Sequence, residues 1–227
     1  MAQIRKSFIM GAAAVALVAG SATAASAAGT GIHSGSATGP LFTGNVQASL
    51  LGTASVTTSL GGGSCNQSTM TGSVNSDGTG VKITGASFTN NPGPSCPGGG
   101  GSVAVSAQGL PWTGGNVTYD SAHTGGRDAS MTIAGFKVKA VASILGGITC
   151  YYGGSVTANG FNADNASRPV TTVSQAEIQL NNVTVNVQSG GSFLCPSTAT
   201  VSATYQLLGE SSPGSGTYNQ QLWVESS

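Results

Sequence analysis

The chain has 227 residues and 6% of them are charged, whereas about 25% are charged in ordinary soluble domains. Seven basic and seven acidic residues cancel, so there is no basic stripe for a nucleic-acid backbone or an anionic membrane, and we expect no nucleic-acid partner. Abundant Val, Thr and Ser with low net charge argue against a disordered chain, and the surface must be covered by hydroxyl and amide side chains and glycine.

The first 28 residues have the pattern of a secretory signal. Arg5 and Lys6 form a positive start, residues 8–20 are apolar, and residues 21–28 are small and contain two A-x-A patterns. A membrane anchor is the alternative, but these thirteen apolar residues would rise only about 20 Å as a helix, against a hydrocarbon core of roughly 30 Å. We therefore expect a secreted, extracellular or cell-surface protein with no transmembrane segment after cleavage.

Residues 29–39 are rich in Gly and Ser, and we expect them to be a flexible lead. Residues 40–227 form the predicted single domain, with two degenerate halves at about 40–115 and 116–227. Apolar residues there recur with a period of two, which is typical of strands with one buried face. Gly-rich and Pro-rich breakers separate the strands at short intervals. The pattern predicts an all-β fold: an antiparallel β-sandwich or Greek-key barrel of about ten to twelve short strands.

Two of the predicted strands lose their alternation at one point. The apolar phase slips at residues 134–135, between Ile133 and Phe136, and again at Asn181 and Asn182. A one-residue slip moves the apolar side chains to the opposite face of a strand. These slips therefore predict bulges, bends or tight hairpins, which return the apolar side chains to the buried face.

Four cysteines, Cys65, Cys96, Cys150 and Cys195, include no C-x-x-C pair for zinc or redox chemistry. In an exported chain an even count favours disulfides, and three connectivities are open. Gly-Ser-Val follows the first cysteine at residues 72–74 and the third at residues 154–156. The second and fourth cysteines are followed directly by Pro and then by a similar strand. This internal similarity suggests a duplication in which each half keeps its own bridge, and it favours the pairs 65–96 and 150–195.

Candidate catalytic residues are few. His33 lies in the predicted lead, and His123 lies beside Asp120, Arg127 and Asp128 in the densest charge cluster of the chain. An acid-base site is conceivable there, but a solvated hairpin tip is the better interpretation. No nucleophile elbow, zinc-protease or phosphate-loop motif occurs. We expect no catalytic residues, no metal and no cofactor, with a small hydrolase assembled in space as the remaining alternative.

A short motif, Leu110, Pro111, Trp112, Thr113 and Gly114, matches the sortase pattern LPxTG. It lies mid-chain, without the apolar stretch and basic tail of a sorting signal, so wall attachment by that route is not expected. With Gly-Ala-Ser-Phe-Thr at residues 85–89 and the cysteine at 96, the motif is similar to the family named for the alkane oxidation protein activator PraB. The resemblance is strongest over residues 65–150. It implies a secreted or cell-surface protein that assists growth on hydrophobic substrates or takes part in surface and matrix association, with no catalytic site.

These observations leave several hypotheses about function. The first is a non-enzymatic extracellular or cell-envelope protein that associates with itself or with envelope components. The second is a module that binds a lipid, a hydrocarbon or a glycan, which requires an apolar pocket or an exposed aromatic strip. The third is a structural subunit that assembles by strand exchange. Trp112 and Trp223 are candidates for ligand or surface contact, although a buried role is favoured for both.

Overall fold

The structure is a computed structural model that describes residues 29–227, so the predicted signal segment lies outside the described residues. This part of the chain is almost entirely β, with two short 3-10 helices, η1 (Thr124–Gly126) and η2 (Ile144–Gly146). The strands are β1 (Thr30–Ser34), β2 (Gly44–Thr58), β3 (Gly61–Cys65), β4 (Gln67–Val74), β5 (Val81–Thr89), β6 (Cys96–Gly98), β7 (Gly101–Ala107), β8 (Trp112–Tyr119), β9 (Ala129–Ala142), β10 (Ile148–Phe161), β11 (Ala176–Gln188), β12 (Thr198–Glu210), β13 (Tyr218–Gln220) and β14 (Leu222–Ser226).

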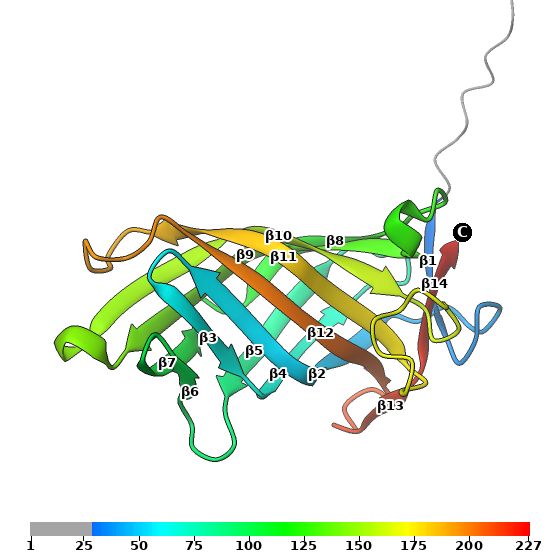
Figure 1. Ribbon diagram of the computed structural model, residues 1–227. Helices are drawn as coiled ribbons and strands as arrows, with labels where there is room; N and C mark the ends of the chain where they lie inside the picture. Colours follow the sequence, from blue (N-terminus) through cyan, green and yellow to red (C-terminus); the bar gives the residue numbers. More distant parts are fainter. Residues whose placement is uncertain (1–28) are drawn as a thin grey trace, which may run out of the picture.

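The long strands form a closed antiparallel barrel (Figure 1). Strand β2 pairs with β12 over nine residue pairs, from Thr57 with Thr200 to Val46 with Gly209, and this pairing closes the ring. From β12 the wall continues through β11, β10 and β9. At one end of the barrel β8, β5 and β4 complete the circle, and at the other end β7, β6 and β3 complete it, because β2 and β9 are long enough to change partners along their length.

The prediction of an all-β antiparallel fold is confirmed, and of the two architectures the structure has the barrel. Both phase slips are β-bulges. The β9–β10 register shifts opposite Gly135, which has φ 70°, and the β11–β12 register shifts at Asn182, which has φ 52°. Glycine and asparagine are the residues that adopt this left-handed conformation at little cost, which explains why the slips occur at them.

The prediction of a flexible lead at residues 29–39 is wrong. Residues 30–34 form β1, which pairs along its whole length with β14, and the Ile32 amide donates to the Ser76 carbonyl at 2.7 Å. His33 is held as well, with Nδ1 2.8 Å from the Gly39 carbonyl oxygen. The two-stranded β1–β14 sheet lies across one end of the barrel, which we call the capped end (Figure 1).

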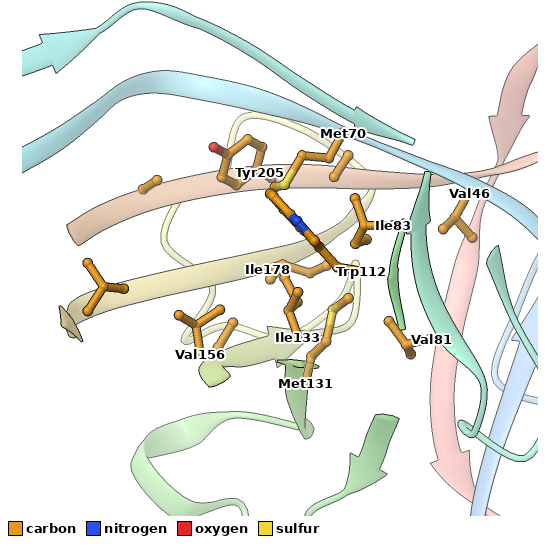
Figure 2. Close-up of a cluster of buried hydrophobic side chains, with 14 of the residues drawn as sticks. Val46, Met70, Val81, Ile83, Trp112, Met131, Ile133, Val156, Ile178 and Tyr205 are labelled. Atoms are coloured by element: carbon orange, nitrogen blue, oxygen red, sulfur yellow. The ribbon is translucent and has the colours of Figure 1, made fainter. Parts of the chain in front are cut away.

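The barrel interior is apolar because inward-facing residues alternate with outward-facing polar ones. In β4, for example, Ser68, Met70, Gly72 and Val74 are buried, and the residues between them are partly exposed. The buried residues from all the long strands form one hydrophobic cluster together with Ile32, Leu222 and Val224 of the cap, and Figure 2 shows its centre. No helix within residues 29–227 has the length and apolar character needed to cross a membrane.

Both disulfides have the predicted pairing, Cys65 with Cys96 and Cys150 with Cys195. The first joins β3 to β6, and the second joins β10 to the loop that precedes β12. Both lie in the half of the barrel away from the cap, where β3, β6 and β7 form part of the wall. Two disulfides fit a protein of an oxidising, extracellular compartment.

Replacing both Cys150 and Cys195 by Ser is expected to lower the free energy of unfolding by about 4 kcal/mol, because the bridge closes a loop of 45 residues in the unfolded chain. Urea unfolding followed by tryptophan fluorescence measures this loss. Reducing both bridges of the unmodified protein should lower its stability at least as much. A double variant as stable as the unmodified protein would contradict the prediction.

Candidate functional site

The interior contains a cavity of about 220 Å³ in the half of the barrel away from the cap. Its wall is formed by side chains that point inward from the long strands, and these are aliphatic or aromatic. Among them are Phe88, Phe136, Val138, Val156, Val185 and Val201. None of the residues that line it, all within residues 29–227, is charged. The cavity therefore favours a ligand whose buried part is hydrocarbon.

A layer of side chains separates this cavity from a smaller one of about 70 Å³ near the capped end. On three strands the residue that lines the large cavity is two positions from one that lines the small cavity: Ile133 and Met131, Leu180 and Ile178, Tyr205 and Leu207. Trp112, from β8, lies among these side chains (Figure 2). We call this layer the plug, and it sets the depth of the large cavity.

The geometry of Trp112 shows why it fills the plug. Its side chain is 2% exposed, and its ring centroid lies 5.0 Å from that of Phe136, which lines the large cavity. Its indole Nε1 donates to the Gln108 carbonyl at 2.8 Å, so the polar atom is satisfied inside the protein. A large aromatic ring with a satisfied N–H is suited to a buried position.

The two tyrosine hydroxyl groups of the lining have partners. The Tyr205 hydroxyl donates to Ser68 Oγ at 3.1 Å, and the Tyr152 hydroxyl donates to the Pro196 carbonyl at 3.2 Å. Burial raises the pKa of both tyrosines, so both stay neutral. A ligand therefore meets a neutral lumen whose hydroxyl donors are already engaged.

The large cavity reaches the surface at the end opposite the cap. Val56, Leu60 and Leu194 line it and are also 36%, 58% and 40% exposed. Residues that are both lining and exposed mark an opening, which we call the mouth. It is surrounded by the β2–β3, β6–β7, β9–β10 and β11–β12 connections, all on the same side of the barrel in Figure 1.

The small cavity contains a buried carboxyl group. Glu177 is 1% exposed; its Oε2 accepts a hydrogen bond from the Val170 amide at 3.0 Å, and its Oε1 has no partner among the described residues. Desolvation raises the pKa of Glu177. Trp223 lines the same cavity and is half-buried. Neither Trp223 nor Trp112, which lies in the plug, is at the mouth.

The charge cluster around His123 is the loop of the β8–β9 hairpin, as the sequence indicates. His123 Nδ1 lies 3.3 Å from Asp128 Oδ1, and Arg127 Nε donates to Asp120 Oδ2 at 2.6 Å. None of these four residues lines either cavity. The Leu110–Gly114 motif leads into β8 and places Trp112 in the plug.

Sequence reasoning missed the residues of the mouth. Leu60, Phe193 and Leu194 lie in segments rich in Gly and Ser, whose composition predicts only breaks between strands. The available signal was the presence of large apolar residues inside such segments, where polar turn residues are usual. Phe193 is 95% exposed, the most exposed large apolar side chain of the described residues.

Comparison with known protein families, curated proteins and solved structures finds no match for this chain. The class is therefore defined by the fold and cavity alone: a closed antiparallel β-barrel, capped at one end, with an apolar lumen that opens at the other.

The buried Glu177 gives a prediction about pH. A raised folded-state pKa means that the folded protein holds the proton more tightly than the unfolded chain, so its contribution is lost as the pH rises above the unfolded value of about 4.3. Glu177→Gln should therefore gain stability relative to the unmodified protein as the pH increases from 4 to 8. Urea midpoints across this range measure the difference.

Glu210 is the matched control, because hydrogen bonds from the Gly216 amide and the Asn45 side chain lower its pKa. Its stabilising contribution is present above the unfolded pKa and is lost as the pH falls. Glu210→Gln should therefore lose stability relative to the unmodified protein as the pH increases from 3 to 5, and the difference should be constant at higher pH. Curves of equal slope for the two variants would refute the assignment.

Proposed function

We propose that this is a secreted, non-enzymatic binding protein of the extracellular space or cell surface that holds an apolar chain, such as a hydrocarbon or the acyl chain of a lipid, inside the barrel. The observation that carries the proposal is the cavity of about 220 Å³, lined by apolar side chains, bounded by the plug and open at the mouth. Pockets of this kind bind ligands mainly through apolar contact.

The cavity suits a hydrocarbon chain better than a glycan. A glycan needs hydrogen-bonding partners for its hydroxyl groups, and burying such groups without partners is unfavourable. Tyr205 and Tyr152 already donate to protein oxygens. A dry apolar cavity of about 150 Å³ holds a benzene ring of six carbon atoms, so by proportion a cavity of about 220 Å³ accepts on the order of nine carbon atoms, which fits a short chain or the terminal part of a longer one.

Other features agree with this class of ligand. The expected export signal and the two disulfides support a protein that works outside the cell, and the expected resemblance of the motifs at residues 85–89 and 110–114 to the PraB family favours a hydrophobic substrate. Assembly by strand exchange receives less support, because the β2–β12 pairing leaves these long strands without a free edge.

The proposal predicts that the purified protein binds N-phenyl-1-naphthylamine, that this probe gains fluorescence in the cavity, and that hexadecanoate displaces it. Tryptophan fluorescence should change as well, because Trp112 contacts the cavity wall at Phe136. Absence of probe binding by the unmodified protein would overturn the proposal.

A matched pair of variants on β2 locates the binding site. Ala54 faces the cavity and Ser55, its neighbour, is exposed on the outer face. Ala54→Phe fills part of the lumen and should weaken binding of the probe at least tenfold, about 1.4 kcal/mol. Ser55→Phe adds the same bulk outside and should leave binding unchanged. Equal affinities of the two variants would place the site elsewhere.

A further inference from the structure

We propose that the mouth of the barrel docks on a lipid surface, so that the apolar ligand passes directly between the lipid layer and the lumen. This inference rests on the proposed function and adds the partner that supplies or receives the ligand. It is carried by three observations: the position of the exposed apolar side chains, the way in which one loop is held, and the distribution of charge.

Exposed large apolar side chains gather at the mouth. Of the five that the described residues contain, Val56, Leu60, Phe193 and Leu194 lie there, and Leu41 lies near the capped end. Single exposed apolar residues are normal on protein surfaces, but a group around the opening of an apolar cavity indicates an interaction site. We call Leu60, Phe193 and Leu194 the rim.

Two of the rim residues, Phe193 and Leu194, are held outward by their loop. The Ser192 amide donates to the Thr149 carbonyl at 2.8 Å, the Cys195 amide donates to the Ser192 carbonyl at 3.1 Å, and the disulfide fastens this cysteine to β10. The loop is thus tied to the barrel wall immediately before and after Phe193 and Leu194. Phe193 is 95% exposed although its loop is fastened, so the fold itself holds this side chain in contact with water.

Charged residues have the opposite distribution to the exposed apolar side chains. The four connections around the mouth, at residues 59–60, 99–100, 143–147 and 189–197, contain no Asp, Glu, Lys or Arg. All the acidic residues lie at or near the capped end, in its loops, at the strand ends that meet it or in β14; these are Asp77, Asp120, Asp128, Asp164, Glu177, Glu210 and Glu225.

This distribution favours a lipid surface over a protein partner. Protein interfaces usually surround their apolar centre with a polar and charged periphery, whereas a group that enters the boundary between headgroups and acyl chains must be free of charge. The rim is uncharged and surrounds an apolar opening, so it has the properties of a group that enters a lipid layer. Docking there also spares the ligand a passage through water, which is unfavourable for every methylene group.

The contact should be weak, reversible and insensitive to salt. Three apolar side chains bury far less area than an amphipathic helix, and there is no basic patch to attract anionic lipid. The nearest charged residues on the strand leading to the mouth are Lys137 and Lys139 of β9, five and three residues before its end at Ala142, and two lysines on one strand do not form a basic patch. Neutral phosphatidylcholine should therefore be a sufficient surface.

The test uses the purified protein and phosphatidylcholine vesicles that contain a fluorescent fatty acid. We expect the protein to float with the vesicles and to remove the fatty acid from them. The variant Phe193→Ser should associate at least fivefold less and remove the fatty acid at least fivefold more slowly. The same variant should bind N-phenyl-1-naphthylamine from buffer as well as the unmodified protein does, because Phe193 does not line the cavity.

Leu41→Ser is the matched control, since Leu41 is 62% exposed at the other end of the barrel. It should leave vesicle association and transfer unchanged, and urea midpoints should show that all variants are folded. Transfer by Phe193→Ser at the unmodified rate would overturn the docking, as would association that requires anionic lipid and disappears in 0.5 M salt. In either case, intact probe binding would leave the proposed function standing; loss of probe binding by the unmodified protein would remove both.

Discussion

The rest of the structure depends on the pairing between β2 and β12. It joins residues about 150 positions apart in the sequence and turns a sheet with two edges into a ring, so that the backbone groups of these strands are paired on both sides. Closure also gives the sheet an inside. Because the strands alternate, the same register that satisfies the backbone sends the apolar side chains into a common lumen and leaves Ser, Thr and Asn outside.

A barrel that contains a cavity loses packing contacts, and the two halves of this barrel offset that loss in different ways. Near the cap, Trp112, Met131 and Ile178 fill the interior, and the β1–β14 sheet covers the end. In the other half the side chains leave the large cavity, and that half contains both disulfides, each expected to stabilise by roughly 4 kcal/mol in the chain-entropy model. Unfilled apolar volume is costly in a core, and the two disulfides offset part of that cost in the half of the barrel that contains the cavity.

The sequence predicts what depends on local pattern. Alternation, the bulges at Gly135 and Asn182, and the disulfide pairing all follow from residues within one strand or one repeat. The strand β1 could not be predicted, because its partner β14 is almost 200 residues away and its Gly-rich sequence gives no strand signal. The cavity could not be predicted either. It is the volume left when side chains from eight or more strands fail to meet, and that difference depends on barrel width rather than on any one residue.

The composition of the plug bears on which ligands the lumen accepts. On the lumen side it presents Met70, Ile133 and Tyr205, whereas Trp112 is fixed behind them by its bond to the Gln108 carbonyl. Methionine is unbranched and adapts its shape to irregular space, whereas isoleucine is stiff at its first torsion. The floor of the cavity thus combines a rigid support with one adaptable side chain. Under the proposed function, such a floor would accept apolar chains of different length, because the terminal group of a longer chain would displace the methionine side chain without disturbing the barrel wall.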